Sequence, residues 1–174
     1  MKKMHKGFTL VELLIVIGII GILSAMGVVG GSEANNIATA NKIVEEFRII
    51  SSAMNMYYAD NRKEIEETTA TDLPAKIKTG LAAYMKTTDN ITATGTAVAG
   101  KYDISVVAAT GQWWLAYKLP QNGANVKVNL ILENKAKTER LLATAQDVDA
   151  TGDGGTTTNF YTAAAGDTLY MRVR

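Results

Sequence analysis

The chain has 174 residues, which is enough for one ordinary domain with a substantial core. Its 18 Lys and Arg residues nearly balance its 17 Asp and Glu residues, so no strongly basic surface argues for a nucleic-acid partner. The absence of cysteine excludes a disulfide framework and thiolate metal sites.

The chain opens with a short basic leader, residues 1–7, followed by the apolar segment 8–31, in which only Glu12 is charged. Since about 20 apolar residues cross a bilayer as a helix, residues 8–31 predict a transmembrane helix, and the leader's lysines would keep its amino end in the cytoplasm. A cleaved secretory signal peptide and a plain membrane anchor are the alternatives. Glu12 argues against both, because an ionised carboxylate in hydrocarbon is costly unless paired. No cation lies within the segment, so we expect the partner to come from another molecule, such as an α-amino group exposed by cleavage just upstream.

The stretch KGFTLVELLIVIGIIGIL resembles the N-terminal signature of type IV pilins and of type II secretion pseudopilins. The resemblance implies that a prepilin peptidase in the membrane cuts after Gly7 and methylates the new first residue, Phe8. It also implies that Glu12 pairs with the N-terminus of a neighbouring identical subunit while an assembly machinery builds the polymer. In a low-dielectric environment such a pair favours one axial stagger of two helices over the others, so it sets register rather than raw stability.

Five glycines punctuate the apolar segment, and they admit two interpretations. A glycine costs a helix interior about 1 kcal/mol relative to alanine. The resemblance implies that part of this region loses its helical structure in assembled filaments, which the glycines would permit. They would equally serve close helix–helix packing, because small residues let backbones approach. The five are Gly18, Gly21, Gly27, Gly30 and Gly31.

Residues 32–60 predict an amphipathic continuation of the same helix. Their apolar residues recur at spacings of three and four and form one stripe, Ile43, Phe47, Ile50, Met54 and Tyr57. Such a stripe is typical of a packed core. Residues 8–60 therefore predict one helix of roughly 80 Å, whose first half faces lipid or sister subunits and whose second half lies on a soluble domain.

Residues 61–174 predict a globular head. TDLPAKIKTGLAAYMK indicates a short helix, with Asp72 as its cap and Pro74 in its first turn, although Gly80 weakens the prediction. YDISVV, QWWLAYKL, NGANVKVNLIL and DTLYMRVR have strand patterns, Asn122-Gly123 predicts a turn, and NKAKTERLLATA indicates a further short helix. We therefore expect an α+β fold in which the long helix packs against an antiparallel sheet of three or four strands, the architecture of related pilins. Strand alternation predicts that one of Trp113 and Trp114 points outward, and we interpret most of the aromatic residues as core rather than as an adhesive or electron-conducting patch.

The sequence offers little for catalysis and one candidate metal site. The only histidine, His5, lies in the leader, so we predict that the chain is not an enzyme. In DVDATGDGG, the residues Asp147, Asp149, Thr151 and Asp153 are spaced like the start of a calcium-binding loop, and some pseudopilins bind calcium in a C-terminal loop. The twelfth position is Thr158 rather than a bidentate glutamate, so a solvated Asp/Gly turn is the alternative. No other cofactor is predicted.

These features together predict the major pilin of a type IV pilus. The chain would be made as a precursor in the cytoplasmic membrane and would polymerise into an extracellular filament. One alternative is the major pseudopilin of a type II secretion system. Another is a single-pass membrane protein whose head binds a ligand or partner at the cell surface.

Overall fold

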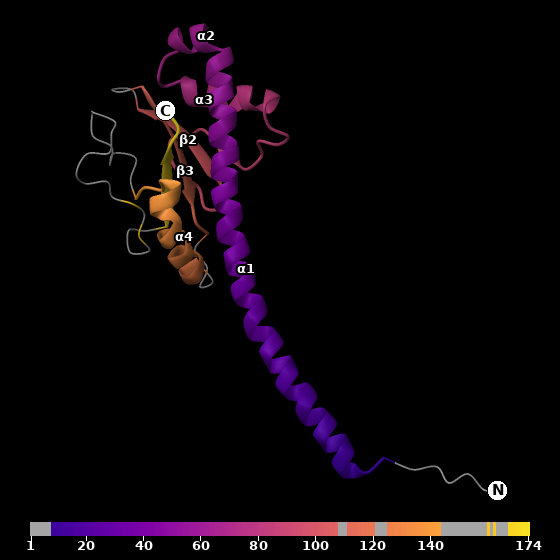
Figure 1. Cartoon of the computed structure of the whole chain (residues 1–174). Coiled ribbons are helices and arrows are strands. Elements are labelled where there is room, and N and C mark those ends of the chain that lie inside the picture. Colours follow the sequence, from indigo (N-terminus) through magenta and orange to yellow (C-terminus); the bar gives the residue numbers. More distant parts are fainter. Residues whose placement is uncertain (1–7, 108–110, 121–124, 144–159, 161, 163–166) are drawn as a thin grey trace, which may run out of the picture.

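The computed structural model describes residues 8–107, 111–120, 125–143, 160, 162 and 167–174, and it describes only the backbone of residues 26–31 and 125. One long helix, α1, extends well beyond a compact head built from short helices and a sheet (Figure 1). The helical elements are α1 (Leu10–Asp60), α2 (Arg62–Glu66), α3 (Leu73–Gly80), the 3₁₀ turn η1 (Leu81–Ala83) and α4 (Asn125–Glu139). The strands are β1 (Ile91–Thr92), β2 (Tyr102–Val107), β3 (Gln112–Lys118) and β4 (Thr168–Arg172).

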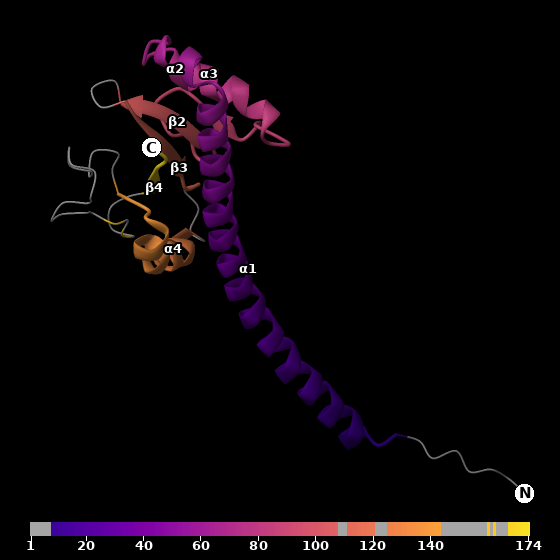
Figure 2. The same ribbon diagram turned by 45° about the horizontal axis from the view of Figure 1, so that its top comes forward.

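Helix α1 contains 51 residues without a break, which confirms the predicted single long helix. It begins at the cap residue Thr9 and ends at Asn61, whose backbone N–H and side-chain amide both donate to the carbonyl of Tyr57 at 3.0 Å. The helix contains no proline, and its backbone stays helical through Gly27–Gly31 while the whole rod curves gently (Figures 1 and 2). The glycines therefore do not interrupt the helix in the single subunit.

The four strands form one sheet in the order β1-β2-β3-β4. Strands β2, β3 and β4 pair antiparallel, as predicted, with Ile104 opposite Leu115 and Leu115 opposite Met171. The two-residue edge strand β1 pairs parallel to β2, so the sheet is mixed rather than purely antiparallel. The predicted α+β arrangement is otherwise confirmed.

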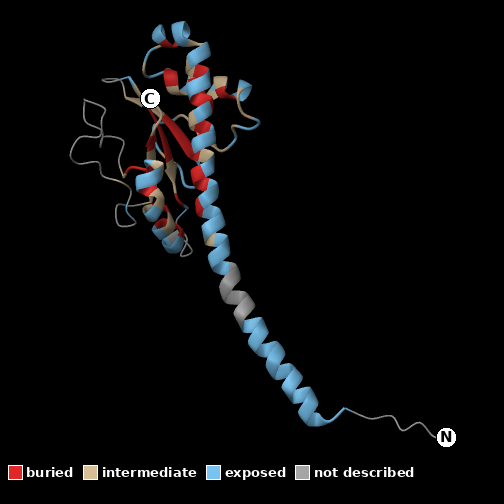
Figure 3. Ribbon diagram, viewed as in Figure 1, coloured by how far each residue is buried: buried red, intermediate tan, exposed pale blue. Residues whose placement is uncertain are grey.

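The core lies between one face of this sheet and the second half of α1. The predicted helical stripe is fully or almost fully buried, from Ile43 to Tyr57. It meets the residues of β2, β3 and β4 that point toward it, namely Tyr102, Ile104, Trp113, Leu115, Leu169 and Met171. Figure 3 shows this burial as a sharp change along α1: the half that lies on the head is buried on one side, while the half that extends away is exposed.

Helix α4 corrects the prediction of a strand over NGANVKVNLIL. Alternation of Val126, Val128, Leu130 and Leu132 indicated a strand, but a period of about four also runs through this stretch. Val128, Leu132 and Ala136 recur at that spacing and are buried in the core, where α4 packs on α1. Of the helix predicted from NKAKTERLLATA, residues 134–139 are helical and form the end of α4, whereas residues 140–143 are not helical, so the prediction is wrong there. The turn predicted at Asn122-Gly123 lies outside the described residues.

Both tryptophans are buried, so the prediction that one points outward is wrong. Trp113 lies on the α1 side of the sheet, and its ring contacts Tyr58 edge-on with centroids 5.5 Å apart. Trp114 lies on the opposite face but is also fully buried, as is its neighbour Ala116. Alternation correctly placed the two rings on opposite faces but was wrong to assume that one face is open to solvent. Most of the aromatic residues are core, as we interpreted them: Tyr57 is buried with the two tryptophans, and Tyr58 is half-buried.

The short helix α3 lies where the sequence predicted it, and Gly80 is needed there rather than tolerated. Ile77 and Leu81 are fully buried. A Cβ built on Gly80 would collide with the ring of Tyr57. The missing side chain therefore lets the end of α3 lie directly on α1. Asp72 precedes α3, although its side chain makes no capping hydrogen bond.

Candidate assembly site

The free end of α1 begins with a reciprocal capping arrangement between Thr9 and Glu12. The Thr9 hydroxyl accepts from the Glu12 backbone N–H at 3.3 Å. The Glu12 carboxylate accepts from the Thr9 N–H at 2.9 Å and from its hydroxyl at 2.8 Å, both at Oε2. This capping box satisfies donors that a helix start leaves unpaired. Its acid also lies at the helix end that favours negative charge.

Glu12 still has capacity for a second partner. Both bonds from Thr9 end on Oε2, and Oε1 has no hydrogen-bond partner among the described residues. Glu12 is exposed, and Phe8 lies just before the cap with 84% of its surface exposed. A cation approaching from another molecule therefore finds an open carboxylate oxygen without first breaking the cap.

The apolar side chains that follow lie outside the core formed by the described residues. The large hydrophobic residues from Phe8 to Leu23 are all exposed, at 48–84% of their surface. Such a contiguous exposed apolar surface is far larger than a solitary soluble protein normally carries, so it marks a surface for lipid or for other proteins.

Among the residues whose side chains are described, no helical stretch meets the length and hydropathy required to cross a membrane. The predicted span 8–31 includes residues 26–31, whose side chains lie outside the described part of the chain.

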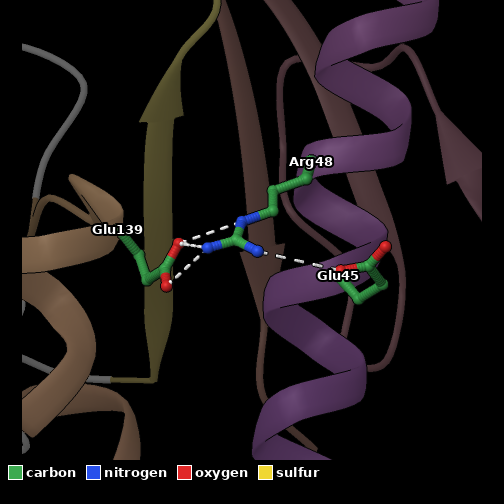
Figure 4. Close-up of polar contacts among 3 residues, drawn as sticks. All are labelled: Glu45, Arg48 and Glu139. Carbon is green, nitrogen blue, oxygen red and sulfur yellow. Dashed lines mark hydrogen bonds and ion pairs between the residues drawn. The ribbon is translucent and has the colours of Figure 1, made fainter.

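An ion pair joins α4 to the half of α1 that lies on the head. The Arg48 guanidinium donates from Nη2 to both oxygens of Glu139, at 2.8 and 2.7 Å, and from Nε at 3.1 Å (Figure 4). Glu45, one turn earlier on α1, lies 3.9 Å from the other Arg48 nitrogen. The Arg48 side chain is largely exposed to solvent, whereas only 12% of the Glu139 side-chain surface is exposed. A forked contact of this kind fixes orientation as well as distance.

A tyrosine in the sheet is tied to α1 just below this ion pair. Tyr102 is fully buried, donates its hydroxyl to the Ile43 carbonyl at 3.1 Å, and meets the Phe47 ring edge-on at 5.2 Å. Burial, followed by the nearby Glu46 charge, raises the pKa of Tyr102 well above its ordinary value. The phenol is therefore held neutral, and it positions the sheet on the helix.

Only part of the predicted site can be located. Phe8 and Glu12 are described and lie together at the free end of α1. Gly7 lies outside the described residues, and so does the candidate calcium loop, Asp147, Asp149, Thr151 and Asp153. The described residues contain no group of three or more acidic or histidine side chains able to hold a metal. Calcium binding therefore stays a prediction.

The comparisons with known proteins agree with this geometry. Residues 2–28 match the family model described as the prokaryotic N-terminal methylation motif. The type IV major fimbrial protein FimA of Dichelobacter nodosus strain VCS1703A is 33% identical over 130 residues, which cover 74% of this chain and 68% of that protein. This chain belongs to the type IV pilin family. A second FimA, from Dichelobacter nodosus, is 39% identical over 72 residues, covering 41% of this chain and 42% of its own. No solved structure matches.

Sequence reasoning identified the residues at the free end of the pilin but missed the contact between its two long helices. Arg48 and Glu139 are 91 positions apart, and the strand assigned to part of α4 hid their relation. A signal was available: Val128, Leu132 and Ala136, followed by the helix-favouring residues Lys137 and Glu139, fit a helical period. That period indicates a second helix, and the charges of Arg48 and Glu139 are compatible with its packing on α1.

Proposed function

We propose that the chain is the major subunit of a type IV pilus, made as a membrane-anchored precursor, cut after Gly7, methylated at Phe8 and polymerised through the apolar half of α1. The observation that carries the proposal is the combination of this exposed apolar half with the open Glu12 carboxylate at its start. The family is a structural one, and we expect no catalysis from this chain.

The pairing step follows from the cap geometry. Cleavage would free a cationic α-amino group at Phe8, one residue before the cap. Glu12 of one copy would accept the Phe8 amine of another through Oε1 while Oε2 keeps its bonds to Thr9. Because a charge pair is strong where water is excluded, copies would stop sliding where the two groups meet. The pair would thus define the axial step between copies.

Of the alternatives, the pilus is favoured over the secretion pseudopilus because the relatives of known role are type IV major fimbrial proteins. The single-pass surface protein is disfavoured because the methylation motif is the part of the chain that matches a family model.

Mass spectrometry of the intact chain purified from cells that produce the assembly machinery tests the processing. We expect a mass beginning at Phe8 with one added methyl group. A chain that still begins at Met1, in cells that process another prepilin normally, would contradict the proposal.

Two substitutions at Glu12 separate capping from pairing. Glu12→Gln keeps an oxygen that accepts from Thr9 but removes the charge, whereas Glu12→Ala removes both. If pairing decides assembly, both variants should be inserted and cleaved yet yield few filaments when surface fibres are sheared off and weighed. Filament yield near wild type for Glu12→Gln, together with a loss for Glu12→Ala, would show that the cap alone matters.

A further inference from the structure

The methionines whose side chains are described differ sharply in their exposure. Met56 on α1 is 54% exposed, whereas Met54, two positions earlier and so on the other side of the helix, is fully buried. Met171 on β4 is 9% exposed and belongs to the core, and Met85 is partly buried against the same core. An oxidant reaches a buried sulfur only when the structure opens around it. Of these four thioethers, Met56 is therefore the one that solvent-borne oxidants meet first.

Met56 lies in a groove that also contains unused hydrogen-bond donors. The groove has a volume of about 570 Å³, and its lining includes Met171 on one side and Ser51, Ser52 and Asn55 on the other. The side chains of these two serines and of the asparagine have no hydrogen-bond partner among the described residues. A side chain in a helix leans toward the preceding turn, so Met56 lies over Ser52. An oxygen atom added to the Met56 sulfur would therefore have a hydroxyl donor close by.

Oxidation would have different consequences on the two sides of the groove. A sulfoxide is polar, and a buried polar group without a hydrogen-bond partner is costly. At Met56 the new oxygen would meet water and the donors of the groove. At Met171 it would enter the core between β4 and α1. The head should thus accept oxidation at Met56 and should lose stability on oxidation at Met171.

We propose that Met56 is a reversible oxidation site, at which a peroxide converts the thioether to a sulfoxide that the free donors of the groove hold. With hydrogen peroxide, a sulfur lone pair attacks one oxygen and the O–O bond breaks. The proton of the transferred oxygen moves to the other oxygen, which leaves as water. Sulfur is oxidised by two electrons and the peroxide is reduced. The reaction needs no polymer, so this site is independent of the proposed function.

Timed exposure of the full-length chain in detergent to hydrogen peroxide tests the order of oxidation. Mass spectrometry of digested samples gives the sulfoxide fraction at each methionine. We expect Met56 to be oxidised at least about tenfold faster than Met54 and Met171, because these two need the head to open. In urea, where the head is unfolded, the three rates should become similar. Equal rates in the folded chain would overturn the proposal.

The stability of the head during the same time course tests whether oxidation at Met56 is accepted. The midpoint of urea unfolding, followed by tryptophan fluorescence, should stay constant while Met56 alone is oxidised and should fall once Met171 is oxidised. A midpoint that falls in step with the sulfoxide at Met56 would contradict the proposal.

The role of the groove is tested by removing its donors while keeping Met56. A variant with Ser51→Ala, Ser52→Ala and Asn55→Ala should be oxidised at Met56 as fast as the wild type. Its midpoint should fall when Met56 is oxidised, whereas that of the wild type should not. If the oxidised and reduced forms of this variant unfold at the same urea concentration, water alone accommodates the sulfoxide and the groove has no part in it.

Reversal is the last test. Methionine sulfoxide reductases of both kinds, one for each epimer of the sulfoxide, should restore Met56 in the folded, oxidised chain. A sulfoxide at Met56 that both enzymes leave in place until the chain is unfolded would show that the site is not reversible.

Discussion

The two halves of α1 share one backbone conformation and differ in everything that surrounds it. From Ala40 to Tyr57, one side of the helix is buried against the sheet and α4. From Phe8 to Leu23, the large apolar side chains are exposed on every side. The second half is thus stabilised by its own subunit, whereas the first half is apolar all round, a pattern typical of a helix that is buried by other molecules.

The two halves of α1 are stabilised by different surroundings. Helices are held mainly by packing of an apolar face rather than by intrinsic propensity. The second half satisfies that requirement within the chain. The first half would satisfy it in a bilayer or against other copies, so under the proposed function the same residues would serve both the precursor and the polymer.

The largest expected difference between the halves comes from removing one large side chain in each. Phe47→Ala should lower the free energy of unfolding by about 3–5 kcal/mol, because it empties a fully buried site beside Tyr102. Ile15→Ala should change it by less than about 0.5 kcal/mol, because Ile15 is 55% exposed and lies outside the core of the described residues.

Urea unfolding of the full chain in detergent measures both. Tryptophan fluorescence reports the head specifically, since Trp113 and Trp114 both lie in β3 and are buried. A loss of several kcal/mol for Ile15→Ala would mean that the rod folds back on the head, and the contrast between the halves would be wrong.

Sequence reasoning located α1, its buried stripe and three of the strands, because each has a clear period and few competing ones. It failed at α4, where Val126, Val128, Leu130 and Leu132 satisfy a strand pattern while Val128, Leu132 and Ala136 satisfy a helical one. Which pattern wins depends on the surface that α1 offers, and that is a tertiary property. Val126 and Leu130 belong only to the strand pattern, and both are exposed in the helix that forms.

The residues of the candidate site likewise fall into those that the local sequence predicts and those that depend on the tertiary structure. Glu12 was predicted because a lone acid in an apolar segment is informative without any knowledge of the fold, and Phe8 was predicted from the resemblance of the stretch around it to the pilin signature. The Arg48–Glu139 contact joins residues 91 positions apart, and the buried Trp114 depends on a covered sheet face. Contacts of this kind follow from the topology: the period of Val128, Leu132 and Ala136 indicates a helix, but it does not indicate which residues that helix meets.

A glycine-to-alanine substitution should lower stability in the head and raise helix stability in the free half of α1. Gly80→Ala should destabilise the head by about 1–3 kcal/mol, since its methyl group would collide with the ring of Tyr57. Gly21→Ala meets nothing within 4 Å and should instead favour the rod's helix by about 1 kcal/mol. Unfolding in urea measures the first, and helical content by circular dichroism on heating measures the second. Equal and small effects would show that α3 moves freely away from α1.

The tyrosine that ties the sheet to α1 should make the head sensitive to alkali. Burial raises the pKa of Tyr102 in the folded state, whereas the unfolded chain ionises near pH 10. Its contribution to stability is therefore complete below about pH 10 and is lost as the pH rises above that value. Tyr102→Phe should cost about 1 kcal/mol at pH 7, where the bond to Ile43 is lost, and less at pH 11. Urea titrations of both proteins at the two pH values measure this, and a penalty that grows with pH would contradict it.

The smallest expected effect concerns the ion pair between α1 and α4. Arg48→Lys keeps the charge but loses the forked contact with Glu139, and because Arg48 is largely exposed we expect a loss of about 0.5–1 kcal/mol. Lys42→Arg, at the exposed pair with Glu46, is the matched control and should change nothing measurable. Glu139 is far less exposed than Arg48, so Glu139→Gln should cost more than Arg48→Lys and should loosen α4 in hydrogen exchange. If α4 amides exchange at the wild-type rate in both variants, apolar packing of Val128 and Leu132 alone holds the helix, and the ion pair only orients it.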